Sequence, residues 1–132
     1  MEIYGHRGAK GAYMENSLQG FIESAKQGID RFELDVRLSS DQQLMVVHDE
    51  KLQRLTHTRL QVSRSTARTL SQTHLRGTQQ GIPTLEEVIL ACPQVKHWQF
   101  EIKTNFTNPL FVTPMKQLIE KHQLHNKVII TS

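Results

Sequence analysis

Strand-like segments alternate with helix-like segments along most of this sequence, and this order limits the fold more than any other feature does. Strands are expected where short apolar or alternating runs occur, at residues 2–5, 31–38, 44–47, 97–103 and 127–131. Helices are expected between them, at residues 18–27, from residue 85 onward and at residues 109–122. Such alternation is typical of an α/β protein with a parallel sheet.

Capping signals mark the expected helix ends. Asn16 or Ser17 can cap the first helix, and Gly28 is placed to end it. Thr84 is followed three residues later by a glutamate, which together predict a capping box. The last helix begins at 108–109, an asparagine cap followed by a proline at the first helical position.

One connection leaves two geometries open. The segment between Asp35 and Val46 is too short for a crossover helix, although parallel neighbours usually need a connection of about a dozen residues or more. The return is therefore either a bare extended segment or a hairpin, and both would leave His48 near the same end of the sheet. The polar stretch 50–81 that follows is expected to form loops, with one short helix near residues 66–73.

Composition narrows the class of protein. The 132 residues suffice for one compact domain, and 37% hydrophobic with 22% charged residues is ordinary for a soluble protein. No apolar run approaches the roughly 18 residues of a membrane helix, and the N-terminus shows no secretory signal. The single cysteine, Cys92, excludes an internal disulfide, so a cytoplasmic location is expected.

The charge balance suits an anionic substrate but not a nucleic acid. The formal net charge is +3 and the pI about 9.2. Because the basic residues are scattered and aromatic residues are few, the sequence does not support nucleic-acid binding.

Two pairs of charged residues stand two positions apart in expected strands. Glu33 and Asp35 would share one strand face, since strand side chains alternate between faces. Alone, such a pair is more often the polar face of a half-exposed strand, but strands in α/β folds are usually covered on both faces. Oxygen ligands at this spacing suit a hard cation such as Mg²⁺ or Ca²⁺. Glu101 and Lys103 repeat the pattern and add a third carboxylate and a cation.

His6 and His48 differ from the other five histidines, because each ends an expected strand and precedes a charged residue. Imidazole titrates near neutral pH, so two such rings can act as base and acid in one reaction. Taken singly, a loop histidine more often has no such role. Arg7, beside His6, offers a planar guanidinium that binds phosphate through two hydrogen bonds.

The sequence resembles the glycerophosphodiester phosphodiesterase family in six ordered motifs that span nearly the whole chain: Gly5-His6-Arg7-Gly8, Glu15-Asn16-Ser17, Glu33-Leu34-Asp35-Val36, Val46-Val47-His48-Asp49, Ile82-Pro83-Thr84-Leu85-Glu86-Glu87 and Glu101-Ile102-Lys103. The resemblance implies a TIM-type (β/α) barrel, of which residues 1–132 would be an incomplete N-terminal part with about five parallel strands. It also implies metal-dependent hydrolysis of small glycerophosphodiesters to an alcohol and glycerol 3-phosphate, an activity of lipid and glycerol metabolism.

Each candidate site residue receives a role from this resemblance. His6 and His48 would be the general acid and base, and Arg7 and Lys103 would contact the phosphate. One divalent cation, Mg²⁺ or Ca²⁺ with Mn²⁺ also open, would be bound by three carboxylates, those of Glu33, Asp35 and Glu101. The chain departs from the family pattern at Met14, at Asp41-Gln42 and at 54–65, where the family has proline, an Asp-Gly turn and a glycine, respectively.

The length of the chain leaves alternatives open for its assembly and its function. A closed barrel of this type takes about 250 residues, so five strands would leave an open edge and an uncovered apolar face. We therefore expect either that the chain is a fragment or that it pairs with a second copy or with a missing C-terminal half. Its function would be that of the family, that of a related phospholipase-type phosphodiesterase, or non-catalytic binding and assembly. The sequence does not identify the alcohol head group.

Overall fold

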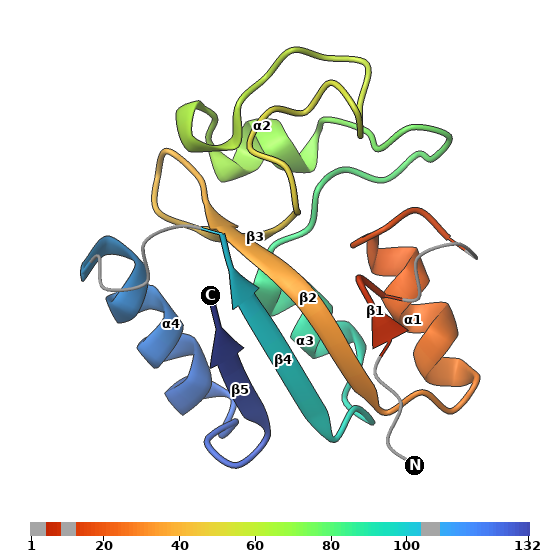
Figure 1. Cartoon of the computed structure of the whole chain (residues 1–132), viewed down its shortest axis with the longest axis vertical. Coiled ribbons are helices and arrows are strands. Elements are labelled where there is room, and N and C mark those ends of the chain that lie inside the picture. Colours follow the sequence, from red (N-terminus) through yellow and green to blue (C-terminus); the bar gives the residue numbers. More distant parts are fainter. Residues whose placement is uncertain (1–4, 9–12, 104–108) are drawn as a thin grey trace.

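The computed structural model describes residues 5–8, 13–103 and 109–132. In chain order its elements are β1 (Gly5–His6), α1 (Leu18–Lys26), β2 (Arg31–Leu38), β3 (Leu44–Val46), a 3₁₀ turn (Val62–Arg64), α2 (Ala67–Ser71), α3 (Leu85–Ala91), β4 (His97–Ile102), α4 (Pro109–Lys121) and β5 (Val128–Thr131) (Figure 1). The expected strands and helices are all present, with ends shifted by one or a few residues. Residues 2–4 of the first expected strand and the expected cap Asn108 lie outside the described residues.

Five strands form one sheet in which four are parallel, in the order β1-β2-β4-β5. The fifth, β3, pairs with the end of β2 in the antiparallel direction, with Val36 opposite Val46. The short return after Asp35 is therefore a hairpin, which decides between the two geometries that the sequence left open. The α/β class and the count of about five strands are confirmed, with β3 as the one strand that is not parallel.

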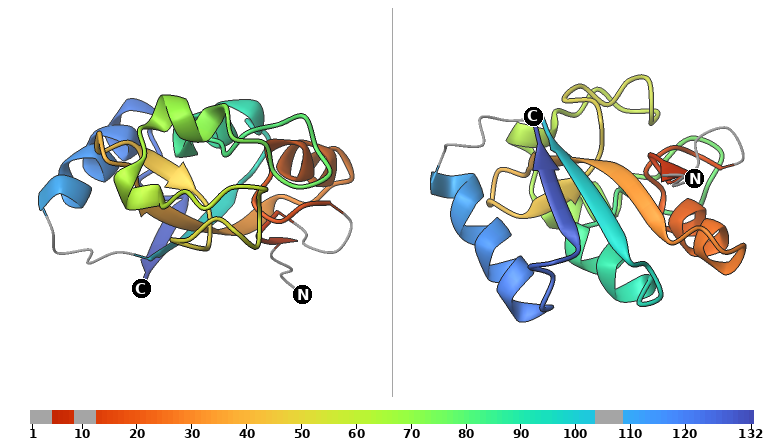
Figure 2. Two further views of the ribbon diagram at one scale, coloured as in Figure 1. Left: turned by 90° about the horizontal axis from the view of Figure 1, so that it is seen from above. Right: turned by 60° about the horizontal axis from the view of Figure 1, so that its bottom comes forward.

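The helices α1, α3 and α4 lie on one face of the sheet, as the two further views show (Figure 2). The main hydrophobic core fills the space between this helical layer and the sheet. Its centre is a group of fully buried or nearly buried aromatic rings: Phe32 packs edge-on against Phe21 at 5.3 Å and lies 5.7 Å from Trp98. Because Phe32, Leu34 and Val36 face this core, the residues between them on β2 face the opposite side.

The helix-free face of the sheet is mainly polar. Glu33 and Asp35 of β2 and Glu101 of β4 alternate with the core-facing residues and therefore point to this face. Among the described residues of this face, an exposed apolar side chain of the kind expected for an incomplete barrel lies toward β5, where Ile129 is 55% exposed. The expectation was wrong for most of the sheet, because the charged residues of β2 and β4 occupy that face.

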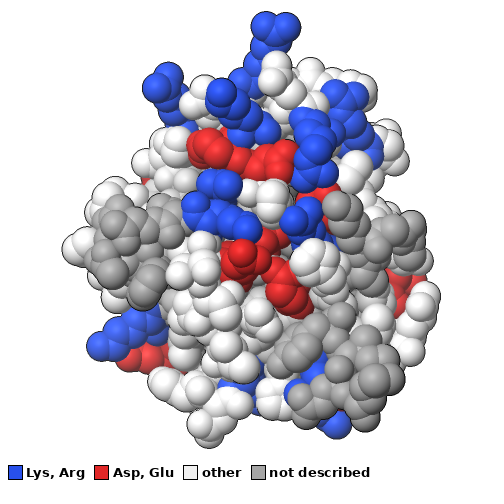
Figure 3. Space-filling model, in the orientation of Figure 1, with Lys and Arg blue, Asp and Glu red and all other residues white. Residues whose placement is uncertain are grey.

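Residues 51–81 form a separate lobe beyond the carboxyl ends of β2 and β4 (Figures 1 and 2). We call this segment the basic lobe, because it contains no Asp or Glu and six cationic side chains: Lys51, Arg54, Arg59, Arg64, Arg68 and Arg76. Lysine and arginine crowd the top of the molecule, where the lobe lies (Figure 3). The expected short helix is α2. The lobe packs around a second hydrophobic core, which includes its Leu52 and Leu70 together with Met45 and Ile82 from outside the lobe.

The predicted capping signals are present. Ser17 rather than Asn16 caps α1, with its hydroxyl accepting a hydrogen bond from the Gly20 amide at 3.1 Å. Thr84 caps α3 in a complete capping box. No helix within the described parts of the chain is long and apolar enough to cross a membrane. Cys92 is buried, and burial raises the pKa of its thiol to about 11.

Candidate metal and phosphate site

Three carboxylates meet on the helix-free face of the sheet. Glu33 and Asp35 belong to β2, and Glu101 lies directly opposite Asp35 on the parallel neighbour β4. One oxygen of each lies within 4.8 Å of the others. Glu33 and Asp35 are only 7% and 1% exposed. The strand pairing that the sequence indicated therefore gathers the three predicted metal ligands into one group that could hold a cation.

The charges of this acidic cluster are incompletely compensated by protein groups. Burial raises the pKa of Glu33, and the neighbouring charge of Asp35 raises it further, while His6 opposes the shift. Lys103 has the reverse effect on Glu101: its hydrogen bond of 2.8 Å lowers the pKa of that carboxyl. Glu33 Oε1 and Asp35 Oδ1 are buried, and within the described residues neither accepts a hydrogen bond. Buried oxygens of this kind fit a hard divalent cation.

Two basic side chains border the acidic cluster. Arg7 Nε lies 3.4 Å from Asp35 Oδ2, and its Nη1 donates to Glu15 Oε2 at 3.0 Å. Lys103 Nζ lies 3.8 Å from Asp35 Oδ1. Arg7 has a φ of 49° and is followed by Gly8 at 71°, where a Cβ would lie 3.2 Å from a core ring. This tight turn directs Arg7 back over the strand end.

The two predicted histidines reach the same region from different strands. His6 Nδ1 lies 2.8 Å from Glu33 Oε2, and its side chain is largely exposed. His48 Nδ1 lies 2.7 Å from Asp49 Oδ1. Its main-chain carbonyl accepts a hydrogen bond from Arg37 Nε at 2.7 Å, and Arg37 Nη1 also donates to the Lys103 carbonyl at 3.3 Å. Six of the seven predicted site residues form one network of contacts, and Arg37 joins His48 to it.

Several polar residues around the site were not assigned a role from the sequence. Glu15 and Asn16 are buried, and Asn16 Nδ2 donates to Asp35 Oδ2 at 3.0 Å. Arg37 continues the charged row of β2, a signal that was visible in the sequence. Asp49 follows His48 at the end of an expected strand, and Arg54 belongs to the stretch that was expected to form loops. Only the folded structure shows their contacts with the site.

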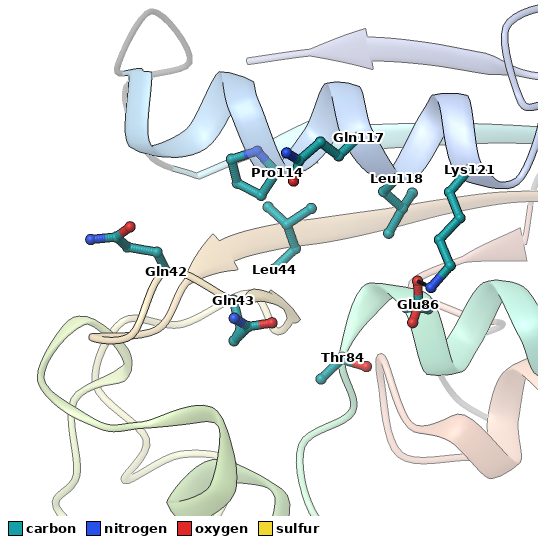
Figure 4. Close-up of a pocket in the computed structure, with 9 residues that line it drawn as sticks. All are labelled: Gln42, Gln43, Leu44, Thr84, Glu86, Pro114, Gln117, Leu118 and Lys121. Atoms are coloured by element: carbon teal, nitrogen blue, oxygen red, sulfur yellow. Dashed lines mark hydrogen bonds and ion pairs between the residues drawn. The ribbon is translucent and has the colours of Figure 1, made fainter.

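A separate hollow of about 430 Å³ lies between α4, the start of α3 and the β2–β3 hairpin (Figure 4). Its walls include Leu44, Pro114 and an ion pair of 3.1 Å between Glu86 and Lys121. None of the three clustered carboxylates lines it. This hollow is therefore distinct from the candidate site. A second hollow, of about 300 Å³, borders Arg37 and Lys103 and so adjoins the site.

Fold and site together define a class of protein. A parallel α/β sheet with an acidic cluster, flanking cations and imidazoles near its carboxyl end is typical of proteins that act on phosphate esters with a metal ion. The family model described as the glycerophosphoryl diester phosphodiesterase family matches residues 6–131. The chain belongs to this family, as its sequence motifs predicted.

Individual relatives agree with this assignment. A glycerophosphodiester phosphodiesterase of Bacillus altitudinis is 34% identical over 142 residues, covering 99% of this chain and 57% of the relative. The solved glycerophosphodiester phosphodiesterase of Thermotoga maritima is 30% identical, with a TM-score of 0.82 over 98% of this chain and 53% of that structure. An Oleispira antarctica phosphodiesterase, solved with its product sn-glycerol-3-phosphate, has a TM-score of 0.88 at 24% identity, over 98% and 56%. The chain thus spans slightly more than half the length of these relatives, whose barrel fold it shares in part.

Proposed function

We propose that the protein containing this chain hydrolyses glycerophosphodiesters to an alcohol and glycerol 3-phosphate in a metal-dependent reaction. The observation that carries the proposal is the acidic cluster itself. Glu33 Oε1 and Asp35 Oδ1 are buried, accept no hydrogen bond from the described residues, and lie beside Arg7, Lys103 and the His6 imidazole. Membership of the family supports the same reaction.

Glu33, Asp35 and Glu101 would hold the cation, which we propose to be Mg²⁺ or Ca²⁺, with Mn²⁺ as a further candidate. Carboxylate oxygens favour these hard ions over softer metals. When bound, the ion would supply Lewis-acid stabilisation of the charge that develops on the phosphate oxygens. Arg7 and Lys103 would add two fixed positive groups for the same oxygens.

The two histidines would move protons. His6 and His48 each hold Nδ1 against a carboxylate, which leaves Nε2 of each ring for the reacting groups. One ring would take the proton of the attacking hydroxyl, which belongs either to water or to the glycerol of the substrate. The other would give a proton to the leaving alcohol. If water attacks, glycerol 3-phosphate forms directly, whereas the glycerol hydroxyl would first form a cyclic phosphodiester that water must open in a second step, with the roles of the two rings reversed.

Hydrolysis of glycerophosphocholine tests the proposal, with Mg²⁺, Ca²⁺ or Mn²⁺ and with or without a chelator. The protein that contains this chain should release choline only in the presence of metal. His48→Ala should abolish turnover and leave thermal unfolding nearly unchanged, because the ring is partly exposed. His74→Ala, in an exposed position of the basic lobe, is the matched control and should retain activity. Lack of metal-dependent turnover in the complete protein would overturn the proposal.

A lipid substrate is the second candidate. Human, rat and mouse relatives, each 28% identical, are lysophospholipases D. Lysophosphatidylcholine assayed beside glycerophosphocholine separates the two: preference for the lipid would favour a phospholipase-type function. A non-catalytic role would be indicated if neither is cleaved while the metal still binds.

Three further expectations concern the setting of the protein. We propose that residues 1–132 are the N-terminal part of one barrel domain. The remainder of the barrel, or a second copy, would pair with β5, which among the described strands contacts only β4. A cytoplasmic location is consistent with the one, buried cysteine.

A further inference from the structure

Arg54 makes four hydrogen bonds to two carboxylates that come from distant parts of the chain. It donates to Asp49 through Nε at 2.9 Å and Nη2 at 3.0 Å. It also donates to Glu15 through Nη1 at 2.7 Å and Nη2 at 3.1 Å. The planar guanidinium is therefore bidentate toward both acids, a geometry that a lysine ammonium cannot reproduce.

Each of these carboxylates touches a residue of the candidate site. Asp49 Oδ1 lies 2.7 Å from His48 Nδ1. Glu15 Oε2 accepts a hydrogen bond from Arg7 Nη1 at 3.0 Å. The contacts thus run without a gap from the imidazole of His48 through Asp49, Arg54 and Glu15 to the guanidinium of Arg7.

We propose that Arg54 is a positioning residue, which fixes the His48 ring and the Arg7 guanidinium relative to each other through Asp49 and Glu15. The inference deepens the proposed phosphodiesterase function and rests on it for its catalytic consequence. The geometric part, the orientation of the ring, can be tested without activity.

The physical basis is the charge of the two acids. At neutral pH Asp49 is an anion that can only accept, and the two hydrogen bonds from Arg54 fix this carboxylate beside His48 Nδ1. His48 must then carry its proton on Nδ1 when the ring is neutral, which leaves Nε2 bare. Glu15 is only 2% exposed at its side chain, and a buried carboxylate needs cationic partners, which Arg7 and Arg54 supply.

A purely structural role would be an ordinary ion pair that fastens the basic lobe to the rest of the molecule. The two roles differ in what the loss of Arg54 changes. A fastening ion pair affects stability alone. A positioning residue affects the tautomer of His48 and the geometry of the site even when the fold is intact. Because the Arg54 side chain is 48% exposed, its replacement should leave the protein folded.

The first test is nuclear magnetic resonance of the histidine rings labelled with ¹⁵N, at a pH where the rings are neutral. The His48 signals are identified by their loss in His48→Gln. The unmodified protein should show the Nδ1–H tautomer at His48, whereas Arg54→Met should show exchange between both tautomers. Arg59→Met, an exposed arginine of the same lobe, is the matched control and should behave as the unmodified protein. A folded Arg54→Met that retains a fixed Nδ1–H tautomer would overturn the inference.

The second test is kinetic and uses the complete protein. Arg54→Met should lower kcat/KM about 100-fold, the cost of a misplacement of about 1 Å, with a fall in kcat through His48 and a rise in KM through Arg7. Arg54→Lys should restore little of this loss, since a point charge cannot hold both acids. In the double variant Arg54→Met/Asp49→Asn, kcat/KM should fall about as far as in the more impaired single variant, because both residues act on His48 through the same contacts. A fall equal to the product of the two single effects would contradict this. If the unmodified protein shows no turnover, the proposed function fails, and the ring measurement decides the inference on its own.

Discussion

The side chain of Asp35 is surrounded by groups that favour its charge, yet one of its oxygens accepts no hydrogen bond from the residues that the structure describes. Asn16 Nδ2 donates to Oδ2 at 3.0 Å, Arg7 Nε lies 3.4 Å from the same atom, and Lys103 Nζ lies 3.8 Å from Oδ1. The like charge of Glu33 opposes them. Such an arrangement is costly without a cation and becomes favourable with one.

Replacing Asp35 with Asn should therefore remove the response to metal. In the unmodified protein, a divalent ion at 100 times its Kd should add about 2.7 kcal/mol of stability. Asp35→Asn should gain little from any such ion, because one of the three carboxylates of the acidic cluster is gone. Thermal unfolding with Mg²⁺, Ca²⁺, Mn²⁺ or chelator measures both effects, with the surface variant Glu23→Gln as control. An equal metal shift in Asp35→Asn would rule out its role as a ligand.

Asp49 gives a second prediction, for acid stability. Its pKa is about 2 in the folded protein against an ordinary value of 3.8. A lowered pKa contributes stability that is complete above the ordinary value and is lost as pH falls toward the folded value. The contribution, roughly 1–2 kcal/mol, should therefore disappear between about pH 4 and pH 2. Urea unfolding of the unmodified protein and Asp49→Asn at pH 5 and pH 2.5 checks this, and a constant difference between them would contradict it.

At this scale the sequence predicted that the three carboxylates come together, but not which residues support them. Glu33, Asp35 and Glu101 could be grouped because strand periodicity places them on one face. The pairing of Arg54 with Glu15 could not be predicted, because it joins residues 39 positions apart through a lobe without regular periodicity.

The elements with strong local signals formed where the sequence placed them. The capping box of α3 and the helical repeat of α1 are local patterns, and both are present. The β2–β3 hairpin was left open because its direction depends on a turn that no proline or Asn-Gly pair marks. Gln42 adopts a φ of 64° in this turn, a conformation that would not be predicted for a glutamine.

The basic lobe depends on a close approach at one glycine. A Cβ on Gly81 would lie 1.8 Å from the main-chain oxygen of Ser71, at the end of α2. Gly81→Ala should therefore displace the chain and cost about 3 kcal/mol or more, as severe overpacking does. Hydrogen exchange should show the loss first in residues 51–81.

Gly77→Ala is the control for this prediction. Gly77 has open space around its Cα but a φ of 73°, so alanine should cost only about 1 kcal/mol of backbone strain. Equal losses in the two variants would show that packing against Ser71 does not matter.

At the scale of the whole molecule, no other described strand pairs with the outer side of β5. The strand β5 pairs on one side with β4, and Ile129 and Ile130 are exposed on it. Unpaired strands with apolar side chains tend to pair with other chains. The family motifs in the sequence predicted the barrel type, but closure of a barrel requires strands that these 132 residues do not supply.

The isolated 132-residue chain should therefore self-associate as its concentration rises. Ile129→Lys should shift it toward the monomer, because a charge on an edge strand opposes pairing. Sedimentation velocity over a range of concentrations measures the change, and Lys127→Gln, at an exposed position just before β5, serves as control. A monomer at all concentrations would contradict the expected pairing through β5.

The basic lobe also makes the charge distribution of the molecule asymmetric. It carries six positive charges, whereas the remaining residues, with ten Lys and Arg against thirteen Asp and Glu, carry a net charge of −3. The positive end of the resulting dipole lies beyond the strand ends that hold the acidic cluster. The electric field would therefore orient an approaching anionic diester and attract it toward this end of the sheet. Such guidance acts over about one Debye length, roughly 8 Å at physiological ionic strength. The association rate constant of anionic diesters should therefore fall as salt is added, while that of zwitterionic diesters should change little. Stopped-flow binding measurements at increasing ionic strength would reveal this difference.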